Sequence, residues 1–169
     1  MPHLAYIENV YVEVVTDEDP DLSYLSQDYA GESEAERERC LAQDRERLAA
    51  YRRDEWSMVG VRLVAEVTTD REGYVDRPIE LRSAGVWGIE SDSGRAYALE
   101  TGQDQTDDLR GQLEALRFSK AELDHALAGP FGLVDSVGLT EPRPEISELR
   151  QSIAPASYTV AAGDLRMRR

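Results

Sequence analysis

The residues best suited to nucleophilic or acid–base chemistry are few and far apart in the sequence. The 169-residue chain has one cysteine, Cys40, and two histidines, His3 and His125. A thiol beside an imidazole could form a nucleophilic pair, but Cys40 falls on the narrow apolar stripe of a predicted helix, which favours packing. His125 falls near the end of a short predicted helix, where interaction with the helix terminus is favoured. We therefore predict no catalytic residues and a protein that is not an enzyme.

Metal and cofactor sites also lack the required spacing. Read as an EF-hand loop from Asp17, the sequence has Leu22 where the turn needs glycine and Asp28 where a bidentate glutamate belongs. Phosphate-binding glycine motifs and zinc spacings are missing too. The apolar runs are far shorter than the roughly 20 residues of a membrane span, and the N-terminus lacks signal-peptide features. We expect a cytoplasmic protein with no cofactor, no metal and no membrane association.

Charge is the strongest signal in the sequence. From Met1 to Glu36 there are ten carboxylates and no lysine or arginine, in a chain whose net charge is −15. A field of one sign repels nucleic acid and anionic membranes and attracts basic surfaces. We predict that Asp17, Glu18, Asp19 and Asp21 steer association with a basic protein. The alternative is a solvated acidic surface that serves solubility.

The block SAGVWGIESDS, which ends at Ser93, combines an aromatic residue with carboxylates. Two glycines bracket Trp87, and Glu90 and Asp92 follow. An aromatic anchor beside charge is common in interface hot spots, so we predict Trp87, Glu90 and Asp92 as a second contact region. The alternative is that Trp87 fills the core while a serine of the block caps a following helix.

A second acidic stretch suggests mimicry of DNA. After Glu90 and Asp92 it continues to Asp104, Asp107 and Asp108, which we also predict as partner contacts. Carboxylates two apart on a strand or four apart on a helix lie roughly 6–7 Å apart, and duplex DNA carries about one charge per 1.7 Å of axis. If both acidic stretches share a face, a basic DNA-binding groove could dock there. Six arginines in the central helix argue against mimicry by the whole surface.

Hydrophobic periodicity predicts a single α+β domain. Alternating residues predict strands over 4–15 and 58–69, and a turn at 70–73 leads to a partner strand over 74–83 in which Pro78 favours an edge or a bulge. Val86–Ile89 is a candidate for a further short strand. A capping box at Ser33–Glu36 predicts a surface helix that ends near Arg53.

Further helices are predicted from residue 104 onward. The first spans 104–118, with Leu109, Leu113 and Leu116 on one face, and a short helix follows from Ser119. We expect a three- to four-stranded antiparallel sheet with helices packed on one face. The domain is expected over residues 1–128, with an extended, proline-punctuated tail over 129–169.

Residues 50–118, roughly, resemble a group of uncharacterised small proteins of actinobacterial phages and mobile elements. The resemblance rests on Tyr51–Trp56, the strand over 59–69 and above all the motif Trp87–Ser93. It implies an accessory gene and favours a role in host takeover or anti-defence. The 18 arginines against one lysine favour a high-GC genome.

We therefore expect an acidic accessory protein that binds and inhibits a basic host protein, with DNA-binding or defence proteins as candidates. Direct nucleic-acid binding is not expected, because no basic patch is interleaved with aromatics. The alternative function is a non-enzymatic structural protein that self-associates as a homo-oligomer.

Overall fold

Two long antiparallel strands form the centre of the molecule. The computed structural model describes residues 4–141, except residues 28, 30, 32, 72–73 and 76–77. β1 (Leu4–Thr16) and β2 (Met58–Arg71) pair along their whole length, with one irregularity between Ile7 and Asn9. Both strands alternate β-branched and polar residues, which directs the two kinds of side chain to opposite faces. The two strands predicted over 4–15 and 58–69 are confirmed.

Three short strands line the other edge of β2. β3 (Tyr74–Val75), β4 (Ile79–Arg82) and β5 (Val86–Glu90) all run antiparallel to β2. We predicted one partner strand over 74–83 and a candidate short strand over 86–89, which β5 confirms. Pro78, which has no N–H to donate to a ladder, lies between β3 and β4 and explains why the partner is divided. Among the described residues the sheet thus has six strands rather than three to four, while the α+β class with helices on one face is confirmed.

The last strand returns to the opposite edge of the sheet. β6 (Gly132–Asp135) pairs with β1 in parallel, so the order across the sheet is β3-β2-β1-β6 with β4 and β5 also on β2. Leu133, Val137 and Leu139 pack against the core. The folded part of the chain therefore continues beyond residue 128 into the segment that we expected to be a tail. The rest of that expected tail, residues 142–169, lies outside the described residues.

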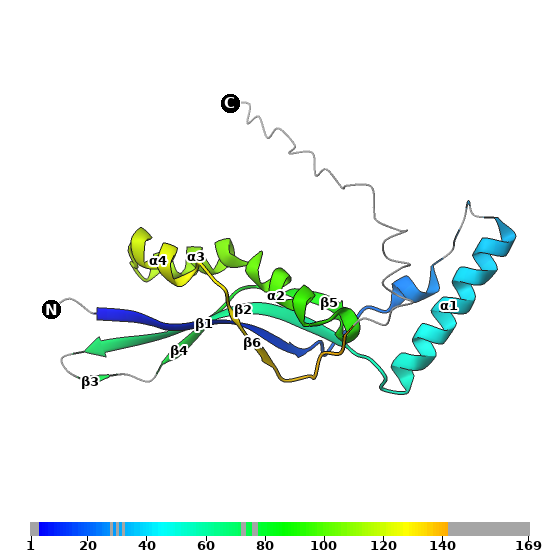
Figure 1. Cartoon of the computed structure of the whole chain (residues 1–169), viewed down its shortest axis with the longest axis horizontal. Coiled ribbons are helices and arrows are strands. Elements are labelled where there is room, and N and C mark those ends of the chain that lie inside the picture. The colour runs from blue at the N-terminus through cyan, green and yellow to red at the C-terminus, as the bar shows by residue number, and fades with distance from the viewer. Residues whose placement is uncertain are drawn as a thin grey trace, which may run out of the picture.

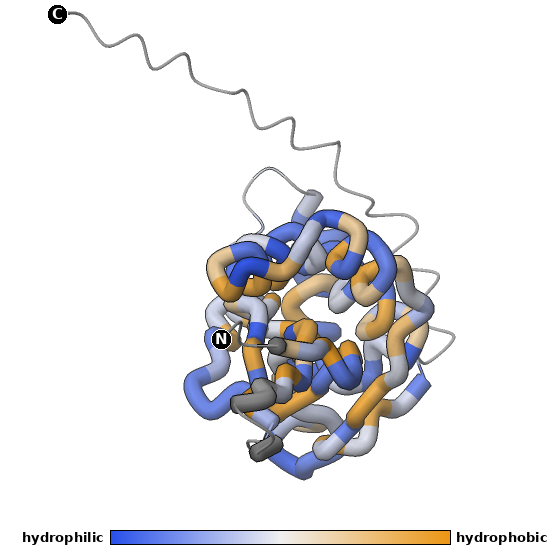
Figure 2. The backbone as a smooth tube through the Cα atoms, turned by 90° about the vertical axis from the view of Figure 1, so that its left-hand side faces the viewer, coloured by the Kyte–Doolittle hydropathy of each residue, from blue (hydrophilic) through white to orange (hydrophobic). Residues whose placement is uncertain are grey.

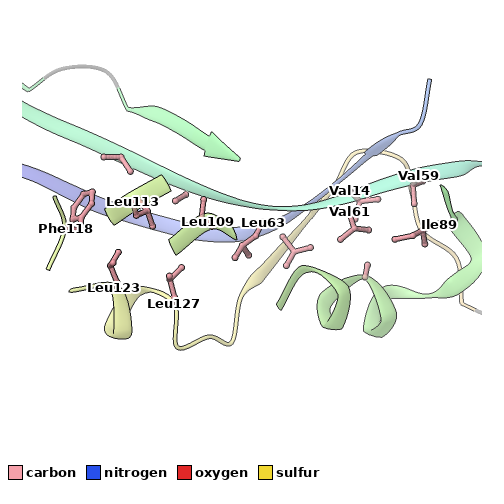
Figure 3. Packing of buried hydrophobic residues seen from close by; sticks show 14 residues of the cluster. Val14, Val59, Val61, Leu63, Ile89, Leu109, Leu113, Phe118, Leu123 and Leu127 are labelled. Carbon is pink, nitrogen blue, oxygen red and sulfur yellow. The ribbon is translucent and has the colours of Figure 1, made fainter. Parts of the chain in front are cut away.

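The main core lies between one face of the sheet and three helices. α2 (Arg95–Gln103), α3 (Thr106–Ala115) and α4 (Lys120–Ala126) cover this face (Figure 1). Leu116 was predicted on the buried side of its helix but is exposed, because α3 ends before it. The buried side chains of this layer (Figure 3) come from three strands and from the helical segment after residue 97: Val12, Val14, Val59, Val61, Leu63, Ala65, Val67, Ile89, Ala98, Leu109, Leu113, Phe118, Leu123 and Leu127.

The segment between β1 and β2 forms an arm at one end of the sheet. It contains a short 3-10 helix, η1 (Ser23–Ser26), and α1 (Glu34–Arg52), which lies apart from the other helices (Figure 1). The predicted capping box of α1 is present, with Ser33 and Glu36 bonded to each other's backbone. A small second core joins the arm to the sheet through Leu25, Ala50, Trp56 and Met58.

The view along the sheet shows how the two kinds of residue are divided. In Figure 2 the tube alternates between hydrophobic and hydrophilic stretches. Such alternation is expected when each strand and helix buries only one of its sides. No helix of the described residues lies over the second face of the sheet (Figure 1). We call it the open face.

Candidate functional site

Trp87 lies on the open face, at the surface of the molecule. Its indole covers Gly60 of β2 so closely that a Cβ at Gly60 would meet a ring carbon at 2.4 Å. The indole Nε1 donates a hydrogen bond to the carbonyl oxygen of Ala84 at 3.1 Å. The residue remains 47% exposed. Of the two alternatives that the sequence left open, the structure favours a surface position for Trp87 over a place in the core.

Two carboxylates hold the backbone around Trp87. The N–H of Gly88 donates to Oδ2 of Asp17 at 3.1 Å, and the N–H of Ala84 donates to Oδ2 of Asp108 at 2.6 Å. Gly88 has a positive φ of 74°, a conformation that side chains disfavour. The segment that carries Trp87 is thus fixed on one side by the acidic N-terminal segment and on the other by the start of α3.

The open face beside Trp87 carries an ordered group of charges. Arg62 donates to Glu13 across the β1–β2 pair at 2.6 Å, and Arg82 lies 3.6 Å from the same carboxylate. Tyr11 donates to Glu80 at 3.4 Å. Burial, together with the charges of Glu80 and Glu13, raises the pKa of Tyr11 above its ordinary value. These arginines are therefore neutralised within the face and do not offset the carboxylates near Trp87.

The side chains of Glu90 and Asp92 face the arm. We predicted both as partner contacts, but each accepts a hydrogen bond from Arg47 of α1, at 3.1 Å and 2.6 Å. Tyr24 also donates to Glu90, at 2.7 Å. The Asp92 side chain is only 6% exposed, and its Oδ2 has no hydrogen-bond partner among the described residues. These carboxylates join the arm to the sheet rather than present charge at the surface.

Arg47 is the positive centre of this junction. Burial alone would lower the pKa of Arg47. The hydrogen bond to Asp92 and the charge of Glu90 outweigh this effect, so the pKa lies above its ordinary value. The arm is also held together away from the sheet, where Tyr29 donates to Asp44 at 2.7 Å. This bond, with burial, raises the pKa of Tyr29 to about 12.

The other predicted contacts are at the surface. Glu18, Asp19, Asp21, Asp104 and Asp107 are exposed. Oδ1 of Asp21 accepts the N–H of Ser23 at 2.9 Å, and this bond lowers the pKa of Asp21. Asp17 and Asp108, one from each acidic stretch, both bond to the segment that carries Trp87. Glu90 and Asp92 of the second stretch are turned toward Arg47 instead.

The structure does not bring the possible nucleophile and base together. Cys40 lies half-buried on α1, and exposed His125 lies on α4 at the other end of the molecule (Figure 1). Within the described residues, no group of three or more His, Cys, Asp or Glu side chains is arranged to hold a metal ion. None of the helices described here combines the length and apolar composition needed to cross a membrane.

Two residues of the site were missed by sequence reasoning. Gly60 provides the space that Trp87 occupies. The sequence could have indicated this, because a glycine within a run of β-branched residues often marks the close approach of another group. Arg47 is the partner of Glu90 and Asp92, and nothing in the sequence separates it from the other arginines of α1.

The fold and site define a class rather than a family: an α+β domain with an open-faced sheet that carries a fixed, exposed tryptophan. Comparison of the chain with family models, with curated proteins and with solved structures finds no match.

Proposed function

We propose that the protein is a non-enzymatic binding protein that docks on a basic surface of another protein and blocks it. The observation that carries this proposal is the position of Trp87, which is 47% exposed and yet fixed by Gly60 beneath it and by Ala84 at its indole nitrogen. Tryptophan is one of the residue types enriched at interface hot spots. Because the ring is already ordered, its burial by a partner costs little conformational entropy.

The acidic residues near Trp87 support a basic partner. Asp17 lies within hydrogen-bond distance of Gly88, and the exposed acids Glu18, Asp19 and Asp21 follow it directly. Exposed charges around an aromatic centre increase the rate of encounter and select against partners of the same sign. The surface charges at Asp104, Asp107 and Asp108 extend this field to the start of α3.

The resemblance to proteins of phages and mobile elements supports a more specific form of the proposal. In this form the chain is an accessory protein and its partner is a host DNA-binding or defence protein. The acids are concentrated near one aromatic residue, and Arg47 neutralises two of them. This distribution supports recognition of a protein surface, with mimicry of DNA limited to the exposed loop acids.

Comparative capture tests the proposal. Wild-type protein and the Trp87→Ala variant are immobilised and exposed to a bacterial lysate at low salt, and retained proteins are compared by mass spectrometry. We expect a small set of basic proteins that the wild type retains and the variant loses. A matched variant, Tyr97→Ala, removes an aromatic that is also 47% exposed but lies on α2, across the sheet. Identical retention by all three proteins would contradict the proposal.

A further inference from the structure

We infer that the Trp87 surface recognises an arginine side chain of the partner protein, stacked on the open side of the indole. This inference rests on the proposed function and deepens it. The indole has one ring face on Gly60, and its N–H is already bonded to Ala84. What remains for a partner is the outer π face of the ring, which attracts cations and apolar groups.

Charge near the ring selects a cation. Oδ1 and Oδ2 of Asp17 each accept one backbone hydrogen bond, from Asp19 at 3.2 Å and from Gly88 at 3.1 Å. A carboxylate can accept about four hydrogen bonds, so Asp17 keeps acceptor capacity beside Trp87. Arg62, on the same face of β2 as Gly60, is bonded to Glu13 rather than to Asp17.

The chain already contains an internal example of this recognition. The guanidinium of Arg47 lies 3.9 Å from the ring centroid of Trp56, and the same group is hydrogen-bonded to Glu90 and Asp92. An indole face and two carboxylates thus hold one arginine inside the protein. The Trp87 surface offers the same kinds of group, an indole face with Asp17 and the neighbouring Glu18, at a place that solvent and a partner can reach.

Arginine fits this surface better than lysine does. A guanidinium is planar, so it stacks on an aromatic ring while its edge donates to a carboxylate. An ammonium group is a compact, strongly hydrated charge without a flat face, so it stacks on an aromatic ring less well. The partner is therefore expected to present an exposed arginine rather than a lysine-rich surface.

Nuclear magnetic resonance of the full chain tests this inference. The protein has two tryptophans, so its spectrum has two indole N–H signals, and buried Trp56 serves as the internal reference. Three glycine-flanked pentapeptides are titrated, with arginine, lysine or neutral citrulline at the centre. We expect the Trp87 signal to shift saturably with the arginine peptide, less with lysine and not with citrulline. The Trp56 signal should stay unchanged.

Variants separate recognition of the guanidinium from general charge. Asp17→Asn keeps an oxygen acceptor for Gly88 but removes the charge, so the affinity for the arginine peptide should fall about two- to fivefold. In Trp87→Ala, which lacks the Trp87 signal, binding is followed by the backbone amide signal of Gly88. The affinity for the arginine peptide should fall at least as much in this variant. Glu100→Gln removes the same charge on α2, across the sheet, and should have no effect.

Three results would overturn the inference. Equal shifts with all three peptides would show that the surface does not recognise the guanidinium. If Trp87→Ala loses capture of the partner but the wild-type Trp87 signal does not respond to the arginine peptide, the proposed function is supported and this inference is wrong. A change of the Trp87 signal in the free full chain on replacing Arg166, Arg168 and Arg169 by glutamine would show that the chain's own arginines, not a partner's, occupy the surface.

Discussion

Arg47 and Trp56 contact each other in two ways. The guanidinium of Arg47 stacks 3.9 Å above the Trp56 ring, and the indole Nε1 of Trp56 donates to the carbonyl oxygen of Arg47 at 3.1 Å. Because Arg47 also pairs with Glu90 and Asp92, one side chain links α1, the start of β2 and the end of β5. The arm is therefore joined to the sheet at the strand that carries Trp87.

Replacing Arg47 should destabilise the whole fold. Arg47→Met removes the cation bonded to the buried carboxylate of Asp92, and we expect a loss of about 3–5 kcal/mol in the free energy of unfolding. Urea unfolding followed by circular dichroism measures it. Arg53→Met is the matched control, because Arg53 pairs with Glu46 and Glu55 on the exposed surface and should change the midpoint little. Equal effects of the two substitutions would contradict this account of the junction.

A methyl group at Gly60 should displace Trp87. Gly60→Ala places a Cβ where the indole now lies, so the ring must move outward, with a cost of about 1–3 kcal/mol. Acrylamide quenching of tryptophan fluorescence should rise, and the indole signal of Trp87 should shift. Gly111→Ala is the control, since nothing lies within 4 Å of its Cβ position in α3, and it should stabilise the helix by about 1 kcal/mol. An unshifted Trp87 signal in Gly60→Ala would show that Gly60 does not support the ring.

Asp135 should make the stability depend on pH in the acidic range. Burial alone would raise the pKa of its carboxyl, but the N–H groups of Gly138, Leu139 and Val137 and the charge of Arg95 lower it overall. Because the pKa is lower in the folded chain, the carboxylate stabilises the fold at pH values above its unfolded-state pKa of about 3.9. This contribution is lost as the pH falls through the folded-state pKa.

The Asp135→Asn variant checks this pH dependence. It should cost about 1–3 kcal/mol at pH 7, and the difference from wild type should shrink between pH 5 and pH 2 in paired urea titrations, where the folded carboxyl becomes protonated. A difference that stays constant with pH would show that the Asp135 charge is not involved.

The loop acids should control how fast the partner is found. The triple variant Glu18→Gln, Asp19→Asn and Asp21→Asn, which keeps Asp17 beside Trp87, should slow association about tenfold at low salt and leave dissociation nearly unchanged, because these exposed charges act on the encounter. Surface plasmon resonance at several salt concentrations measures both rates with a captured partner. An unchanged slope of the association rate against salt would exclude steering by these residues.

The fold was more predictable from sequence than the site. Val12, Leu63 and their neighbours alternate at period two, and this pattern is sufficient to place two strands and the buried face between them. β6 was missed because Gly132–Asp135 is short, has one polar end and gains its stability from pairing with β1, more than 100 residues earlier in the chain.

The candidate site depended on contacts between distant segments. Trp87 and Asp17 could each be named from the sequence, but their proximity depends on the hydrogen bond to Gly88, across 71 residues of chain. Glu90 and Asp92 look the same in sequence as the surface acids. Their inward direction is fixed by Arg47, which is 43 and 45 residues away.

Site-specific photo-crosslinking tests the central claim most directly. The photoreactive residue p-benzoyl-phenylalanine is placed at Val86, which is exposed and adjacent to Trp87, and in a second protein at Tyr97 on α2. Irradiation in a bacterial lysate should link position 86, but not position 97, to a basic protein, and Trp87→Ala should abolish the adduct. The same adducts from both positions, or adducts from position 86 only with a second copy of this chain, would contradict the account.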